Sequence, residues 1–153
     1  MAFIPDEDRD YLTKHFQQEM RDPVKLVFFT QRESPLMIAG SHAQECAYCK
    51  ETRQLLEELT ELSIKLQLET HDFVAERGLA DSYGVDKIPA TVITDGDRKN
   101  IKFFGIPTGY EFVTLIEGII DVSRGSADLS PQAREALARL GSDVRIQVLV
   151  TPT

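Results

Sequence analysis

Two cysteines, Cys46 and Cys49, are the residues of this 153-residue chain best suited to chemistry. They are its only cysteines, and Ala47 and Tyr48 separate them. In a C-x-x-C pair the first thiolate attacks a substrate disulfide, and the second sulfur resolves the mixed disulfide that results. A helix N-terminus lowers the pKa of a thiol, because its unpaired backbone N–H groups favour the anion. If the pair begins a helix, the sequence predicts thiol–disulfide exchange with Cys46 as nucleophile and Cys49 as resolving thiol.

Two other roles for the cysteines have to be weighed. A tetrahedral zinc site needs two further ligands, and the three histidines, His15, His42 and His71, do not form a close pair in the sequence. Inert buried cysteines are common in proteins, but a pair at a helix start after a buried strand is better placed for attack than for burial. We therefore favour redox chemistry and expect no metal.

A proline at the entrance of a strand is the second feature, in the motif Lys87-Ile88-Pro89-Ala90-Thr91. Proline is a common turn residue at a strand start. A cis Pro89 would instead turn the backbone of Ile88 toward the sulfurs, where it could bind an extended substrate in β fashion. The sequence leaves both readings open. Tyr48, Ile88 and Pro89 are the expected substrate-binding residues.

Hydrophobic patterning predicts the elements that position these motifs. Residues 24–30 form a nearly continuous apolar run typical of a buried strand, and residues 48–65 carry leucines at the spacing of an amphipathic helix. The cysteine pair therefore lies at a helix N-terminus. The remaining patterns predict helices over 6–20, 75–83 and 110–122 and strands over 66–73, 88–94 and 99–104, the last two joined by a tight turn at Asp95-Gly96-Asp97. This order predicts an α/β fold, a mixed sheet with helices on both faces.

The end of the chain is predicted to be an appendage. A polar linker over 124–130 is followed by a helical pattern over 131–140 and a strand pattern over 144–150. The stretch 22–26 is echoed at 142–146, either by chance or because a second copy of the unit begins there. We expect a domain over 1–123, a linker over 124–130, and a helix and strand over 131–153 that resemble the start of a second, missing unit.

Composition excludes several classes of partner. The formal net charge of -8 argues against nucleic acid and anionic membranes, which both favour clustered Lys and Arg. No apolar run approaches the roughly 20 residues of a membrane span, and the N-terminus lacks the pattern of a signal peptide. Two cysteines three positions apart cannot form the disulfide framework of a small secreted fold. We expect a cytoplasmic protein.

The order of these motifs resembles the thioredoxin superfamily: a strand, C-x-x-C at a helix start, Tyr83-Gly84-Val85, Ile88-Pro89, two strands and a helix. Cys-Ala-Tyr-Cys is similar to the Cys-Pro-Tyr-Cys of glutaredoxins. Nearly the whole chain resembles the N-terminal unit of the two-unit protein disulfide oxidoreductases of thermophiles, through the stretches 23–26, 90–91, 103–105, 111–112, 121–124 and 143–146. The resemblance implies a thioredoxin fold, the same two cysteine roles and a cis Pro89. We expect protein disulfides as substrates and no cofactor. The resemblance also makes a thioredoxin-reductase-like flavoprotein a candidate partner.

The chain departs from this family at two places. Its relatives carry a second unit with its own cysteine pair, which this sequence lacks. Residues 31–45 also lengthen the connection between the first strand and Cys46. This insertion is either a tolerated surface loop or a flap or interface patch with an apolar centre at 35–40.

Two classes of function remain after these arguments. The chain is either an enzyme that exchanges disulfides with proteins, or a thioredoxin-like docking or electron-relay module of a larger redox system. The sequence does not decide the direction of electron flow. A terminal strand over 145–150 could pair with the edge of another chain, which raises a homodimer as a hypothesis.

Overall fold

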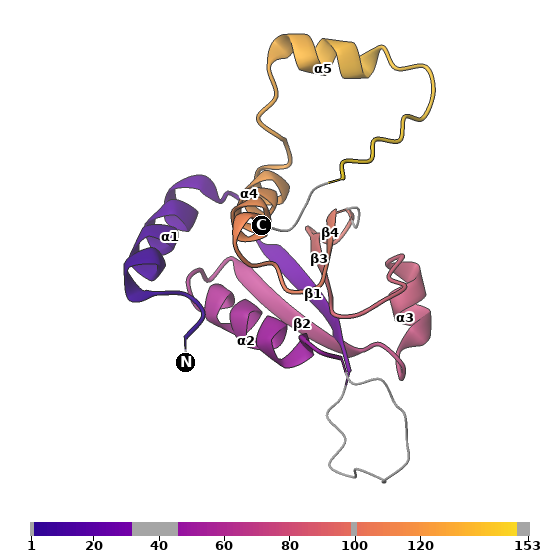
Figure 1. Cartoon of the computed structure of the whole chain (residues 1–153). Coiled ribbons are helices and arrows are strands. Elements are labelled where there is room, and N and C mark those ends of the chain that lie inside the picture. Colours follow the sequence, from indigo (N-terminus) through magenta and orange to yellow (C-terminus); the bar gives the residue numbers. More distant parts are fainter. Residues whose placement is uncertain (1, 32–45, 99–100, 150–153) are drawn as a thin grey trace, which may run out of the picture.

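The computed structural model describes residues 2–31, 46–98 and 101–149 (Figure 1). The insertion over 31–45 lies outside this part from residue 32 on. The elements follow the order predicted from the sequence: α1 (Asp6–Glu19), β1 (Val24–Thr30), α2 (Cys49–Thr60), β2 (Leu66–Asp72), α3 (Arg77–Ser82), β3 (Ala90–Thr94), β4 (Ile101–Phe104), α4 (Tyr110–Arg124) and α5 (Pro131–Ala138).

The four strands form one mixed sheet in the order β2-β1-β3-β4. β1 is parallel to β2, with Val24 opposite Leu66, and β3 is antiparallel to both β1 and β4. The turn between β3 and β4 begins at Asp95, whose carboxylate accepts the backbone N–H groups of residues 97 and 98. Gly96 in this turn has a φ of 107°, which favours glycine. The predicted parallel pair is confirmed, and a turn begins at Asp95 as predicted, while residues 99 and 100 of this connection lie outside the described part.

Helices cover both faces of the sheet, as predicted. Alternate residues of β1 face opposite sides, so that Leu26 and Phe28 pack into the core under α1, α2 and α4, whereas Val27 and Phe29 pack into a smaller core under α3. Figure 1 shows α1, α2 and α4 on one side of the sheet and α3 on the other. β1, central and covered on both faces, is the nearly continuous apolar run that a buried strand requires.

Helix α2 ends at Thr60, five residues before the predicted boundary. The chain turns at Ser63, whose carbonyl accepts the N–H of Leu66 and whose hydroxyl accepts the N–H of Lys65. Serine competes for backbone hydrogen bonds in this way and so favours turns over helix interiors. The leucine spacing continues past the end of the helix because Leu62, in the turn, and Leu66, the first residue of β2, are also buried.

Helix α4 extends to Arg124, two residues past the predicted end. The fully buried Ser123 donates its hydroxyl to the carbonyl of Asp22 at 2.6 Å and accepts the N–H of Arg21 at 2.9 Å. The Arg124 guanidinium pairs with Glu19, and Gly125, with a φ of 69°, ends the helix. These contacts tie the end of α4 to the entrance of β1.

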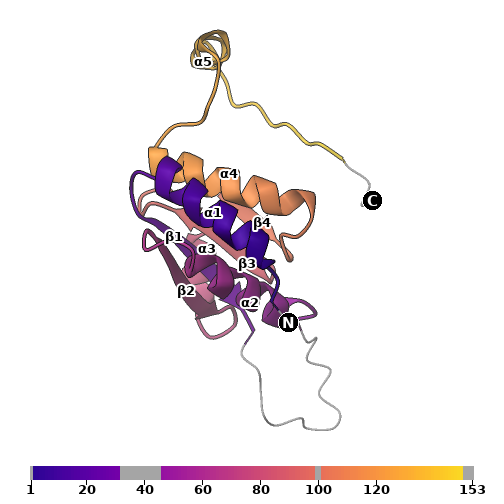
Figure 2. The same ribbon diagram turned by 90° about the vertical axis from the view of Figure 1, so that its left-hand side faces the viewer.

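Residues 131–149 contribute no buried side chain to the body. Helix α5 is capped by the Ser130 hydroxyl, which accepts the N–H of Ala133, and has Pro131 in its first turn. The predicted strand is not formed over 144–149: these residues are extended and exposed, with Ile146 81% and Leu149 97% accessible. A strand needs a backbone partner, and no strand among the described residues pairs with this segment. Figure 2 shows α5 standing away from the sheet.

Candidate redox site

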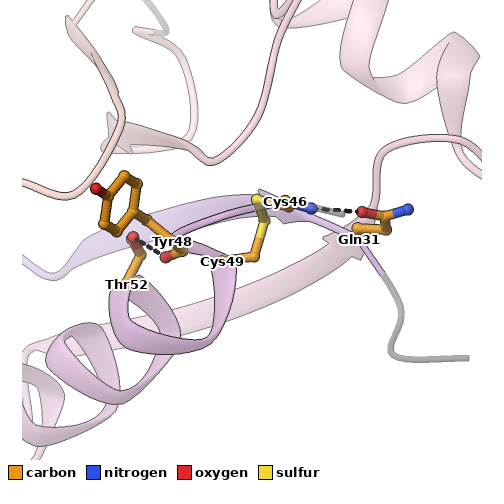
Figure 3. Close-up of a disulfide and its surroundings, with 5 residues drawn as sticks. All are labelled: Gln31, Cys46, Tyr48, Cys49 and Thr52. Atoms are coloured by element: carbon orange, nitrogen blue, oxygen red, sulfur yellow. Dashed lines mark hydrogen bonds between the residues drawn. A yellow bond between two sulfur atoms is a disulfide. The ribbon is translucent and has the colours of Figure 1, made fainter. Parts of the chain in front are cut away.

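Cys46 and Cys49 are joined by a disulfide, with their Cα atoms 5.5 Å apart (Figure 3). This structure therefore represents the oxidised form of the pair. The pair lies just before and at the start of α2, beyond the carboxyl end of β1. The predicted placement of both cysteines at a helix N-terminus is confirmed.

The two sulfur-bearing residues differ in exposure. Cys46 is partly exposed, and the intervening Ala47 and Tyr48 are exposed, Tyr48 to 56%. Cys49 is only 6% accessible and is the first residue of α2. An external disulfide can therefore reach Cys46 more easily than Cys49.

The cysteine pair lies at the first turn of α2. Tyr48 is the N-cap residue but provides no side-chain cap. Its carbonyl accepts both the N–H and the hydroxyl of Thr52, at 2.9 and 2.6 Å, which closes the first turn. Because unpaired N–H groups at a helix start favour negative charge, this turn stabilises a thiolate formed beside it.

Gln31 is a site residue that the sequence argument missed. Its side-chain oxygen accepts the backbone N–H of Cys46 at 2.9 Å, as Figure 3 shows. Gln31 directly follows β1, so this bond fastens the cysteine turn to the central strand. Fourteen residues separate the two in the sequence, and no local pattern marks a glutamine that closes such a loop.

The Ile88-Pro89 peptide bond is cis, as one of the two readings of this motif required. The Pro89 carbonyl accepts the N–H of Gly105 at 2.9 Å, and Pro89 itself is buried. Phe29 lies opposite Ala90 in the antiparallel β1–β3 pair, so Pro89 meets the carboxyl end of β1. The proline turn and the cysteine turn therefore lie at the same end of the sheet.

Charged and aromatic side chains pair with one another around this end of the sheet. His71 at the end of β2 packs its ring against Phe29, with centroids 5.7 Å apart, and contacts Glu76 through Nδ1 at 2.6 Å. This hydrogen bond holds the pKa of Glu76 below its ordinary value. The Lys87 ammonium lies over the Phe104 ring, 4.9 Å from its centroid.

Metal and membrane sites can be assessed for the same part of the chain. Among residues 2–31, 46–98 and 101–149, no group of three His, Cys, Asp or Glu side chains is arranged to hold a metal ion. No helix in these ranges is long and apolar enough to cross a membrane. The suggested flap or interface role of the 31–45 insertion falls almost entirely outside the described residues.

The comparisons with known proteins place this architecture among redox proteins. No family model and no curated protein matches the sequence. Among solved structures, the chain is similar to the AhpF component of the alkylhydroperoxide reductase of Enterococcus faecalis V583, at 25% identity and a TM-score of 0.75 over 91% of this chain and 62% of that one. A second structure, of the N-terminal domain of that component, gives 25% identity and a TM-score of 0.72 over 87% and 59%.

A third similar structure is a protein disulfide oxidoreductase from Aeropyrum pernix K1. It shares 22% identity and a TM-score of 0.71 over 92% of this chain and 56% of that one, and at this identity it supports the fold alone. The chain thus spans about three fifths of the length of each of these three structures.

Proposed function

We propose that this chain, which has the thioredoxin fold and a disulfide-forming Cys-x-x-Cys pair, is a thiol–disulfide oxidoreductase that exchanges disulfides with protein substrates. The observation that carries the proposal is the asymmetry of the pair: Cys46 is partly exposed before α2, and Cys49 is 6% accessible at its first position. This arrangement suits an attacking thiol and a resolving thiol.

In the reducing direction, the Cys46 thiolate attacks one sulfur of a substrate disulfide. The Cys46–substrate bond forms, the substrate S–S bond breaks, and the second substrate sulfur leaves as a thiolate that takes up a proton. The Cys49 thiolate then attacks the sulfur of Cys46 and releases the first substrate sulfur. The substrate gains two electrons and two protons, and the pair returns to the disulfide seen in this structure. The same steps reversed oxidise a substrate dithiol.

Tyr48, Ile88 and Pro89 are proposed to bind the substrate. This proposal is supported by the position of Ile88 just before β3, at the end of the sheet that carries the cysteines, where an extended chain could add in β fashion. Tyr48, exposed to 56%, offers an apolar and hydrogen-bonding surface beside Cys46. A reducing compartment such as the cytoplasm is the proposed location, because the chain has no cysteines besides this pair.

Reduction of insulin disulfides by dithiothreitol tests the enzyme proposal. The wild-type chain is expected to accelerate insulin precipitation, Cys46→Ser to abolish the acceleration, and Cys49→Ser to accumulate a mixed disulfide detectable by mass spectrometry. Circular dichroism of each variant controls for folding. A folded wild-type chain without activity would contradict the proposal.

A relay or docking module is the second candidate function. It is favoured by the similarity to a component of a larger reductase, of which this chain spans 62%. In this role the cysteine pair would pass electrons between a thioredoxin-reductase-like flavoprotein and another redox protein. A folded chain that is inert toward insulin but is reduced by such a flavoprotein with NADPH would favour the module over the enzyme.

We further propose that residues 131–153 begin a second thioredoxin-like unit, joined to the first through 124–130. The exposed apolar residues of 144–149 and the unmatched two fifths of the similar structures support this division. The exposed apolar residues of 144–149 could alternatively be buried by pairing with a second copy of this chain. Light scattering distinguishes a dimer from a monomer, and a monomeric mass in solution would contradict the homodimer hypothesis.

A further inference from the structure

Two buried hydroxyl groups have no hydrogen-bond partner in the part of the chain that the structure describes. They are Oγ1 of Thr30, which is 3% accessible, and Oγ1 of Thr91, which is fully buried. A buried hydroxyl without a partner is costly, and native proteins satisfy nearly all of them. Exceptions of this kind call for an explanation, such as a catalytic role or an ordered water.

Both hydroxyls lie on the face of the sheet that α1, α2 and α4 cover. Thr30 follows Phe28 by two residues in β1 and Thr91 precedes Ile93 by two in β3, and both Phe28 and Ile93 belong to the core shared with α2. Phe28 lies directly opposite Thr91 in the antiparallel register. Thr30 and Thr91 are therefore diagonal neighbours on one face.

Both threonines lie at the end of the sheet that carries the cysteine turn and the proline turn, here called the redox end. Thr30 is the last residue of β1 and precedes Gln31, which holds the N–H of Cys46. Thr91 is the second residue of β3, directly after Pro89 and Ala90. α2 begins above this end with Cys49, whose side chain is buried.

The other buried hydroxyls among the described residues have partners. Thr52 donates to the Tyr48 carbonyl, Ser123 donates to the Asp22 carbonyl, and Thr94 accepts the N–H of Gly96. Among the described residues, the unpaired buried hydroxyls are thus confined to the last residue of β1 and the second residue of β3, at the end of the sheet where α2 begins.

We propose that Thr30 and Thr91 form a pair of hydrogen-bond donors that stabilises the Cys49 thiolate when the disulfide is reduced. This inference rests on the proposed function and deepens it at the resolving step. A disulfide carries no charge and accepts hydrogen bonds weakly, so the hydroxyls have no partner in the oxidised form. A buried thiolate requires donors, because burial disfavours the charged form.

The resolving step shows where this stabilisation acts. Cys49 loses its proton to solvent and attacks the sulfur of Cys46, so that the Cys46–Cys49 bond forms and the bond from Cys46 to the substrate breaks. The electron pair of the broken bond leaves with the substrate sulfur, which takes up a proton. Stabilising the Cys49 thiolate increases the fraction of molecules ready for this attack.

A Cys46→Ala background isolates the test, because Cys49 is then the only thiol in the chain. Thiolate absorbance in the ultraviolet follows its ionisation with pH. Removing one hydroxyl as Thr30→Val or Thr91→Val is expected to raise the titration midpoint by about one pH unit, and the double variant by about two. Thr30→Ser and Thr91→Ser, which keep the hydroxyl, are expected to restore it.

Thr94→Val is the matched control. Thr94 is buried in β3, as Thr91 is, but it lies on the face that α3 covers and at the end of the strand away from the cysteines. This variant is expected to lower stability without moving the Cys49 midpoint. An unchanged midpoint in both single valine variants and in their double variant would overturn the proposal and indicate that ordered water satisfies the hydroxyls. If a valine variant fails to fold, the corresponding Thr→Ala variant decides by the same criterion.

Kinetics in the two-cysteine chain provide the second readout. A tenfold loss of thiolate is partly offset by the greater nucleophilicity of a more basic thiol, so each single variant is expected to resolve a mixed disulfide about three- to fourfold more slowly at neutral pH. Failure of the proposed function would appear as an inactive wild type, whereas failure of the hydroxyl pair would appear as an unmoved titration. The two failures are therefore distinguishable.

Discussion

Glu58 on the redox helix α2 is predicted to hold the N-terminal segment in place. Its carboxylate, in a side chain 13% accessible, accepts the backbone N–H of Phe3 at 2.9 Å and that of Ile4 at 3.0 Å. The Gln54 amide donates to it at 3.0 Å, and the Arg9 guanidinium lies 3.9 Å away. Ile4 is 2% accessible and belongs to the main core, so the carboxylate also fixes a core residue.

The substitution Glu58→Gln tests this interaction with nearly the same shape. An amide side chain has one acceptor oxygen in place of two and no charge, so the backbone N–H groups of Phe3 and Ile4 both lose a charged partner. Since a hydrogen bond to a charged group contributes about 1.5–3 kcal/mol, the variant is expected to lose a free energy of unfolding of that size at pH 7. For a chain of this length this corresponds to a melting temperature lower by about 3–12 °C.

The pH dependence of this loss follows from the pKa of Glu58. Burial acts to raise this pKa, but the donors from Ile4, Gln54 and Phe3 and the charge of Arg9 together hold it below its ordinary value of 4.5. A carboxyl whose pKa is lowered by folding contributes stability that is fully present above the unfolded pKa and is lost as the pH falls through the folded pKa. The difference between wild type and Glu58→Gln should therefore be full at pH 7 and shrink below pH 4.5.

Urea denaturation of the oxidised protein at neutral and acid pH measures this difference. Glu57→Gln is the matched control, because Glu57 precedes Glu58 on the same helix and is exposed. The control is expected to change stability by less than about 0.5 kcal/mol. The reasoning is refuted if the two variants agree at pH 7, or if the deficit of Glu58→Gln persists undiminished in acid.

Three further predictions concern the redox end of the sheet. Gln31→Ala removes the acceptor of the Cys46 N–H and should cost about 1 kcal/mol in urea denaturation, while Gln31→Glu, which keeps an acceptor, should restore most of it; equal losses would contradict the role of this bond. Tyr48→Ala should leave stability within about 0.5 kcal/mol, since the ring is largely exposed, but raise KM for insulin; an unchanged KM excludes Tyr48 from substrate binding. His71→Ala should raise the pKa of Glu76 toward its ordinary value in carboxyl NMR titration, and a pKa that stays low would point to a different cause.

Most of the fold could be predicted because its elements are encoded locally. The apolar run of β1, the leucine spacing of α2 and the turn at Asp95 each specify their own geometry over a few residues. The order of the elements then leaves few ways to cover both faces of the sheet. The boundaries were less accurate where a leucine pattern continues past the end of a helix, as it does through the turn at Ser63 after α2.

The site was predictable only in its two sequence motifs, the cysteine pair and the proline. The spacing of Cys46 and Cys49 identifies the pair, and the proline motif raised the cis peptide as one of two readings. The bond from Gln31 to Cys46 and the unpaired hydroxyls of Thr30 and Thr91 depend on which segments the fold brings together. Such contacts leave no periodic signal, because glutamine and threonine occur in many surface and strand positions.

The predicted strand over 144–150 shows the limit of pattern alone. The alternation at Val144, Ile146 and Val148 is that of a half-buried strand, yet these residues are exposed in this chain by 59%, 81% and 77%. A strand is stable only when its backbone groups have partners, and local alternation cannot supply them. The alternation therefore indicates that this segment could form a strand against a partner strand, but not by itself.

The two cysteines at the start of α2 need different environments, because Cys46 has to be accessible and Cys49 is nearly buried. Cys46 has to be reachable by a substrate, and its backbone N–H is held by Gln31, which follows the end of β1. Cys49 has to ionise while nearly buried, so exposure to water cannot supply its hydrogen bonds. Thr30 at the end of β1 and Thr91 near the start of β3 carry hydroxyl donors without partners at this end of the sheet. The nucleophile and the resolving thiol thus depend on different groups: Gln31 at the carboxyl end of β1 holds the backbone of Cys46, whereas Thr30 of β1 and Thr91 at the adjacent start of β3 are the donors proposed for Cys49.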